Sequence, residues 1–179
     1  AGFFAGDFEQ AHDAACAFAR DLFALPIAEP ADLVIASSGA IKNFVQTHKC
    51  LFNAYQAVKP GGRIIMLAQC PEGLGGEQFQ KWLRLGTREA IIAGLRARAE
   101  INGQTALSTI QKAPITTFVT DMGEAEVALL RGRKAANLEA ALEAVRAELA
   151  ADGIDAPTYY VMPSSAYTVP FLPSEVAAG

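Results

Sequence analysis

Residues 31–70, ADLVIASSGAIKNFVQTHKCLFNAYQAVKPGGRIIMLAQC, decide the fold of this chain. A short apolar run at 31–37 is followed by an amphipathic stretch at 43–58 and by a second apolar run at 63–70. Continuous apolar runs of this length are typical of strands that are buried on both faces of a parallel sheet. Strand, helix and strand in this order predict a right-handed βαβ unit at 31–70.

The same alternation continues on both sides of this unit. Helices are predicted at 7–22, where Asp7 is the expected cap, and at 77–85, 87–99, 104–112, 124–131 and 138–149, and strands at 115–120 and 159–162. Together they predict an α/β fold, a three-layer sandwich with a mostly parallel sheet. The 179 residues contain no interior linker, so we expect a single domain over 1–179. The chain begins on an apolar run without Met, and we expect it to be a piece of a longer protein.

Composition excludes several classes of protein. Hydrophobic residues make up 51% and charged residues 19%, a balance that excludes a disordered chain. No apolar run approaches the roughly 18 residues of a membrane span, and a net charge of −4 argues against a nucleic-acid partner. The three cysteines are far apart in sequence, so we expect reduced thiols and a cytoplasmic protein, with Cys16 and Cys50 acting as small hydrophobes.

Ligands of parallel α/β sheets bind beyond the carboxyl ends of the strands, which makes 37–42, 70–76 and 120–123 the candidate loops. The second loop contains the Gly-rich string EGLGG at 72–76, between a predicted strand and a predicted helix. A helix N-terminus in that position is suited to anions, but the glycine spacing is not that of a dinucleotide or P-loop fingerprint. The hypothesis of a nucleotide-dependent enzyme therefore rests on analogy between folds alone.

One face of the predicted helix at 43–58 carries Gln46, Lys49 and Asn53, at spacings i, i+3 and i+7. This face begins just after the loop at 37–42, where a ligand is expected. A lysine with a glutamine one turn before it can bind a carboxylate, since the ammonium supplies charge and the amide supplies direction. The alternative is an ordinary solvated face, because polar stripes are usual on surface helices.

Other side chains with catalytic potential are isolated. The sequence has two histidines, of which His12 is expected to be structural and His48 to be turned partly away from Lys49. Two separate histidines do not form a metal site, and no serine lies in a G-x-S-x-G elbow. We therefore predict no metal ligand, nucleophile or general base in this chain, and expect it to contribute binding groups.

The chain resembles the C-terminal domain of the nickel-pincer lactate racemase family, whose members are 2-hydroxy acid racemases and epimerases. The resemblance rests on five strings in matching order: FFAGDFEQAHDAA at 3–15, ADLVIASSG at 31–39, NFVQTHKCLFNAYQAVKPGGRIIMLAQCPEGLGG at 43–76, TALSTIQKAPITTFVTD at 105–121 and YYVMP at 159–163. The segment Gln46-Thr47-His48-Lys49 is its most specific part. The resemblance covers most of the chain.

The resemblance implies that this chain is the C-terminal half of a two-domain protein with its active site between the domains. The N-terminal domain anchors the nickel-pincer nucleotide cofactor and supplies the acid/base histidines, and a hydride leaves C2 of a 2-hydroxy acid and returns to its other face. In this chain Lys49 and Gln46 match the family's cleft-facing residues, and they would hold and orient the substrate. Ser38 and Gly39 are the further substrate-binding candidates. The implied partners are a small 2-hydroxy acid and the N-terminal domain. A membrane is not an expected partner.

Two departures from the family pattern bear on the substrate. The loop Ser38–Lys42 is a few residues shorter than in the family, and the family's tryptophan before the strand at 115–120 has no counterpart near Ile101–Gln104. Loss of a large aromatic side chain reshapes a pocket, so a 2-hydroxy acid other than lactate is plausible. The alternative function is a non-catalytic α/β module of the same family that binds a small molecule.

Overall fold

The computed structural model describes residues 1–173, and every strand pairing within them is parallel. The main sheet has five strands in the order β5-β4-β3-β2-β6. Its strands are β2 (Ala31–Ser37), β3 (Val58–Leu67), β4 (Thr116–Val119), β5 (Arg133–Ala135) and β6 (Tyr159–Met162). A separate two-stranded sheet pairs β1 (Ala24–Pro26) with β7 (Val169–Phe171).

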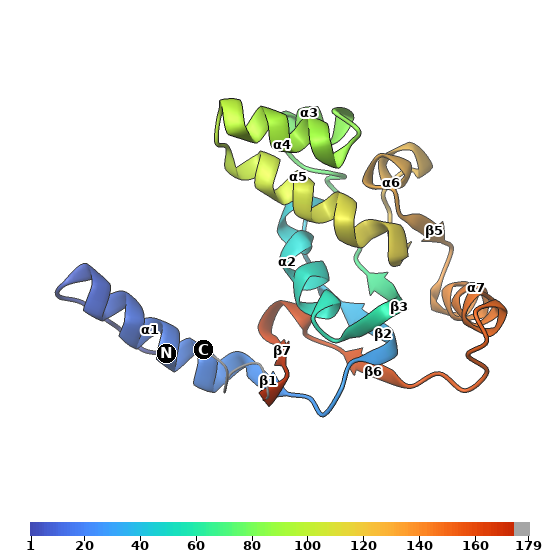
Figure 1. The fold of residues 1–179 in the computed structure, drawn as a ribbon, viewed down its shortest axis with the longest axis horizontal. Helices are drawn as coiled ribbons and strands as arrows, with labels where there is room; N and C mark the ends of the chain where they lie inside the picture. The colour runs from blue at the N-terminus through green and yellow to red at the C-terminus, as the bar shows by residue number, and fades with distance from the viewer. Residues whose placement is uncertain (174–179) are drawn as a thin grey trace.

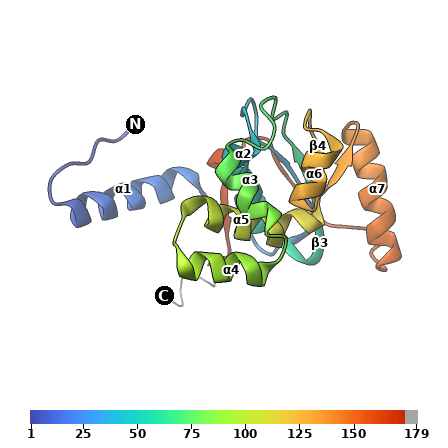
Figure 2. The ribbon, with the colours of Figure 1, turned by 90° about the horizontal axis from the view of Figure 1, so that it is seen from above.

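Helices cover both faces of the main sheet (Figures 1 and 2). One face carries α2 (Phe44–Tyr55) and α5 (Ile101–Lys112), with α3 (Glu77–Arg84), α4 (Arg88–Ala97) and α6 (Glu124–Leu130) packed around them. The other face carries α7 (Leu138–Ala151). Alternate side chains of β2 and β3 enter two separate apolar cores, with Val34 and Ile64 in one and Leu33 and Ile65 in the other. The predicted three-layer α/β sandwich is confirmed.

The βαβ unit at 31–70 is confirmed, but its second strand begins earlier than predicted. The helix ends at Tyr55, and β3 begins at Val58, which pairs with Ala31. The next pairing joins Leu33 to Arg63, so β3 carries extra residues at this point. Gly61, with φ of +83°, lies in this irregular stretch. The Pro-Gly-Gly string at 60–62 therefore lies within the start of a strand.

The sequence analysis missed three strands, β1, β5 and β7, each of three residues. Segment β5 is basic, yet each of its three residues is half-buried. Arg133 Nε lies 3.2 Å from a carboxylate oxygen of Glu148 on α7, and Lys134 Nζ donates a hydrogen bond to the Met122 carbonyl. These contacts attach the edge strand to its neighbours.

Helix α1 (Phe8–Phe23) projects away from the rest of the molecule (Figures 1 and 2) and buries none of its residues. Asp7 caps it as predicted, since its carboxylate accepts a hydrogen bond from Gln10 N. Two expectations for this helix are wrong because of its position outside the core. Cys16 is exposed and not a buried hydrophobe, and the side chain of His12 is 74% exposed, so neither residue packs in the domain.

Asp32 attaches the edge strand β6 to the centre of the sheet. Its carboxylate accepts hydrogen bonds from the backbone N–H of Thr158 (2.8 Å) and the Thr158 hydroxyl (2.7 Å), and from Lys59 Nζ at 3.0 Å. The Thr158 hydrogen bonds, helped by Lys59, lower the pKa of Asp32 from 3.8 to about 2. The ionised carboxylate is therefore the form that stabilises the fold.

A lowered carboxyl pKa in the folded state makes this stabilisation dependent on pH. The contribution of Asp32 is fully present above the unfolded pKa of 3.8 and is lost as the pH falls through the folded value of about 2. In urea unfolding followed at a series of pH values, Asp32→Asn is expected to flatten the decline in unfolding free energy across this window. An unchanged decline in Asp32→Asn would show that other carboxylates cause it.

Candidate functional site

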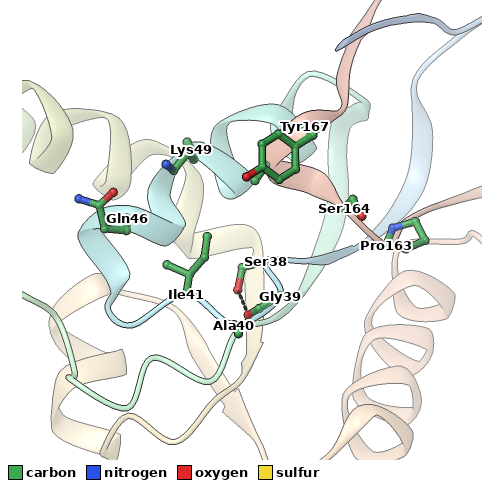
Figure 3. A pocket seen from close by; sticks show the side chains of 10 residues that line it. Ser38, Gly39, Ala40, Ile41, Gln46, Lys49, Pro163, Ser164 and Tyr167 are labelled. Atoms are coloured by element: carbon green, nitrogen blue, oxygen red, sulfur yellow. Dashed lines mark hydrogen bonds between the residues drawn. The ribbon is translucent and has the colours of Figure 1, made fainter. Parts of the chain in front are cut away.

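A cavity of about 470 Å³ lies beyond the carboxyl ends of β2 and β6 (Figure 3). It is lined by Ser38, Gly39, Ala40, Ile41, Gln46, Lys49, Pro163, Ser164, Ala166 and Tyr167. All four residues predicted for the site, which are Ser38, Gly39, Gln46 and Lys49, are in this lining. The structure therefore brings the predicted site residues together around one opening.

The first strand-end loop forms the floor of the cavity. Ser38 is buried, and its backbone N–H and hydroxyl both donate to the Leu67 carbonyl, at 3.0 and 3.4 Å. The hydroxyl also lies 3.2 Å from the Gly39 carbonyl. Gly39 has φ of +65°, a left-handed conformation that favours glycine. The Ser38 hydroxyl proton is thus directed at the protein backbone, and its oxygen can only accept from a ligand.

Helix α2 starts with all four of its first backbone N–H groups satisfied. Phe44 N donates to the Gly73 carbonyl at 3.0 Å and Val45 N to the Leu74 carbonyl at 3.3 Å. Gln46 N donates to the Asn43 side chain at 3.2 Å, and Thr47 N to the Asn43 carbonyl at 3.1 Å. A helix N-terminus binds an anion through free N–H groups. Since none is free here, positive charge for a bound anion must come from a side chain.

The Gly-rich loop 70–76 has a structural role that was not predicted from its sequence. Its carbonyls hold the start of α2, and Glu126 holds the loop in turn, since its carboxylate accepts from Leu74 N at 3.2 Å and Gly123 N at 2.9 Å. A Cβ at Gly73 would collide with that carboxylate. These glycines therefore let the loop approach α2 and Glu126 closely. Nothing in this arrangement supports the hypothesis that the loop binds a nucleotide.

Lys49 and Gln46 are the exposed polar side chains that α2 presents to the cavity (Figure 3). Within residues 1–173, neither side chain makes a hydrogen bond or ion pair with another residue. Unpaired polar groups of this kind are free to bind a ligand without first breaking a contact. An ammonium and an amide one helical turn apart are suited to a carboxylate or a carbonyl oxygen.

Asn53, the third residue of the predicted polar stripe, does not join this pair. Its side-chain amide donates to the Ser165 carbonyl at 2.8 Å. The Ser165 hydroxyl, which is fully buried, donates to the Ser37 carbonyl at 2.6 Å. Asn53 therefore fastens the segment after β6 onto α2, and its role is structural.

The segment Pro163–Tyr167 forms the remaining wall of the cavity, and the sequence analysis did not predict it. The signal was present, because the segment follows the carboxyl end of the predicted strand at 159–162. The rule that identified the loop at 37–42 applies equally to this strand end. Tyr167 is the large side chain of this wall and is 69% exposed.

Several charged and reactive groups on or against α2 are buried or half-buried. Lys112 is 6% exposed, and its ammonium lies 4.9 Å from the ring centroid of Phe52 and 5.0 Å from that of Tyr55. Burial, with Lys112 nearby, lowers the pKa of His48 to about 4, so this imidazole is neutral near pH 7. Burial raises the pKa of the Cys50 and Cys70 thiols, which disfavours their reactive thiolate form.

The residues that line the cavity do not suit a nickel ion. Their polar groups are an ammonium, an amide, a phenol and hydroxyls. Within residues 1–173 there is no group of three or more His, Cys, Asp or Glu side chains that could hold a metal ion. The donor set fits a small oxyanion instead.

No helix of this part of the chain is long and apolar enough to cross a membrane.

Fold and cavity together define an α/β domain with a polar cavity at the carboxyl ends of parallel strands. Residues 27–158 match the family described as the lactate racemase C-terminal domain, and the chain belongs to this family. It is 40% identical over 84 residues to the lactate racemase of Thermoanaerobacterium thermosaccharolyticum, a match that covers 45% of this chain and 20% of that enzyme. The lactate racemase of Lactiplantibacillus plantarum is 38% identical over 81 residues, which cover 44% of this chain and 19% of that enzyme.

Solved structures have the same fold. The apoprotein of lactate racemase from Thermoanaerobacterium thermosaccharolyticum superposes with a TM-score of 0.76 at 24% identity, over 91% of this chain and 40% of that one. A protein from Thermotoga maritima superposes with a TM-score of 0.57 at 12% identity, over 92% of this chain and 42% of that one. The chain thus spans well under half the length of these relatives.

Proposed function

We propose that this chain is the C-terminal, substrate-clamping domain of a nickel-pincer-dependent 2-hydroxy acid racemase or epimerase. The observation that carries the proposal is the cavity in which Gln46 and Lys49 stand together without protein partners. Family membership supports the reaction class, since the curated relatives are lactate racemases. The rest of the polypeptide, outside this chain, forms the other side of the active site.

In this proposal Lys49 binds the carboxylate of the 2-hydroxy acid, or the oxygen at C2 when that carbon is a ketone. The His48 imidazole beside it is neutral near pH 7, so Lys49 supplies the positive charge that α2 brings to the cavity. Gln46 orients the same group through its amide, whose two ends donate and accept. Because α2 is fixed at its N-terminus by Asn43 and the loop 70–76, both side chains start from a rigid backbone.

In the proposed reaction the hydroxyl proton passes to an acid/base histidine while the C2 hydrogen leaves as hydride, and both return to give the opposite configuration at C2. When bound, the nickel-pincer nucleotide would supply the group that accepts and returns this hydride. We assign its anchoring, and the acid/base histidines, to the part of the protein outside this chain. Closure of the two parts over the cavity would exclude water from the oxidised substrate.

Gln46→Ala tests the orienting role in the full-length, cofactor-loaded protein. We expect kcat/KM for racemisation to fall roughly 10-fold, because one hydrogen bond that positions the substrate is lost. Nickel content should be unchanged, since Gln46 is not a metal ligand in this account. Chiral chromatography of the hydroxy acid and metal analysis of the same sample give both readouts. A variant with unchanged kcat/KM, or one that has lost its nickel, would contradict the assigned role.

The same protein distinguishes the catalytic proposal from a non-catalytic binding module. A racemase should contain nickel and interconvert the two enantiomers of at least one 2-hydroxy acid. A binding module should bind a hydroxy acid in calorimetry, with an affinity that depends on Lys49, and leave its configuration unchanged. The second result, obtained with cofactor supplied, would replace the racemase assignment.

A further inference from the structure

Tyr167 is the large aromatic side chain in the wall of the cavity that faces α2 (Figure 3). It is 69% exposed although it comes two residues after the fully buried Ser165. Aromatic rings at the edge of a cavity offer a large contact area at a small cost in side-chain entropy. The exposed area of this ring is therefore available to a ligand in the cavity.

The backbone that carries Tyr167 is held in a fixed relation to Lys49. Tyr167 N donates to the Ser164 carbonyl at 2.9 Å, which closes the short turn η2 (Ser165–Tyr167). That turn is attached to α2 through Asn53, which lies one turn after Lys49 on the same helix. It is attached to β2 through the hydrogen bond from Ser165 to Ser37. The separation of Tyr167 from Lys49 is thus set by one helix and one strand.

Phe23, the last residue of α1, supports the ring of Tyr167. The two ring centroids are 5.9 Å apart at an interplanar angle of 37°. Helix α1 buries none of its own residues, so this pair is a contact between the projecting helix and the cavity wall. The pair restricts the orientations of the Tyr167 ring, which also lines the cavity.

The charged group and the aromatic ring of the lining lie on different elements. Gln46 and Lys49 stand on α2, whereas the other wall carries Pro163, Ala166 and the ring of Tyr167 beside the hydroxyls of Ser164 and Tyr167. A 2-hydroxy acid has a similar division, with a carboxylate and hydroxyl at one end and the C2 substituent at the other. A carboxylate held at Lys49 therefore directs the C2 substituent toward the wall that carries the Tyr167 ring.

We propose that Tyr167 determines the substrate specificity of this domain by packing against the C2 substituent of the substrate. This inference rests on the proposed function and names its substrate class more closely. The residues beside Tyr167 in the lining are the small Ser164, Ala166 and Pro163, which leaves its ring accessible to a substituent larger than methyl. The favoured substrates are accordingly 2-hydroxy acids with a bulky apolar or aromatic group at C2.

Selectivity measured in the full-length, cofactor-loaded protein tests this role. The probes are 2-hydroxy acids with a methyl, an isobutyl or a benzyl substituent at C2. Tyr167→Ala is expected to lower the ratio of kcat/KM for the benzyl acid to that for the methyl acid by about tenfold or more. Tyr167→Phe keeps the ring and should keep the ratio. Tyr159, which is 65% exposed on β6 and lines a different groove, provides the matched control Tyr159→Ala.

The outcomes separate this inference from the function on which it rests. A wild-type protein that racemises these acids, with the same ratio in Tyr167→Ala, overturns the specificity role alone. An equal loss for all three acids also overturns it, because a merely structural role lowers every rate together. A wild-type protein that interconverts none of the acids overturns the proposed function.

Discussion

Replacing Lys49 by alanine in the full-length, cofactor-loaded protein is expected to lower kcat/KM for racemisation on the order of 100-fold or more. Lys49 is the cation that lines the cavity, and the first N–H groups of α2 are all bound to the protein. Without its ammonium, a carboxylate in the cavity loses its charge partner and its position. The thermal midpoint should hardly change, because Lys49 is exposed and forms no ion pair within residues 1–173.

Two further variants control for charge and for surface position. Lys49→Arg keeps the charge but presents a wider, planar group, so it should recover part of the activity. Lys42→Ala removes a neighbouring lysine that is 77% exposed and paired with Glu72, outside the cavity lining, and should change kcat/KM by no more than about twofold. Steady-state racemisation assays on matched preparations measure all three. Full activity in Lys49→Ala would remove Lys49 from the site.

Phe44→Ala is expected to lower the free energy of unfolding by about 3–5 kcal/mol. Phe44 is the first residue of α2 and is fully buried. Its ring stacks on Phe79 at 6.0 Å between centroids and meets Phe118 edge-on at 5.8 Å. Truncation to alanine would leave a cavity where α2, α3 and β4 meet, directly below the start of the helix that carries Gln46 and Lys49.

Urea unfolding followed by far-UV circular dichroism measures this loss. Phe44→Leu keeps most of the buried volume and should lose much less stability than Phe44→Ala. Phe8→Ala, at a side chain in α1 that is 79% exposed, should change the unfolding free energy by less than about 0.5 kcal/mol. A loss below about 1 kcal/mol in Phe44→Ala would mean that the core around α2 closes over the missing ring.

The central fold could be predicted because its strands are continuous apolar runs. The strands at 31–37 and 159–162 have the bounds expected from the sequence alone. The strands β1, β5 and β7 could not be found, since three residues are too short to show a period of two. Segment β5 is also basic, and only its pairing with β4 and the contact of Arg133 with Glu148 explain its place in the sheet.

The predicted site residues meet in one cavity because helical spacing fixes Gln46 and Lys49 on one face, beside the strand-end loop with Ser38 and Gly39. The structural role of Asn53 could not be predicted from helical spacing, because its partner Ser165 is more than 100 residues away in sequence. Tyr167 was missed for a different reason. The rule about strand ends was applied to three strands and not to the last, although the chain there is just as close to the ligand position.

The most direct test of the account follows hydrogen at C2 during the reaction. One enantiomer of a 2-hydroxy acid, deuterated at C2, is incubated in ordinary water with the full-length, cofactor-loaded protein. We expect the opposite enantiomer to form with its deuterium retained, because the hydride leaves and returns without exchange with solvent. We also expect Lys49→Ala to slow this conversion. A product that has lost its deuterium, or no conversion of any 2-hydroxy acid, would contradict the account.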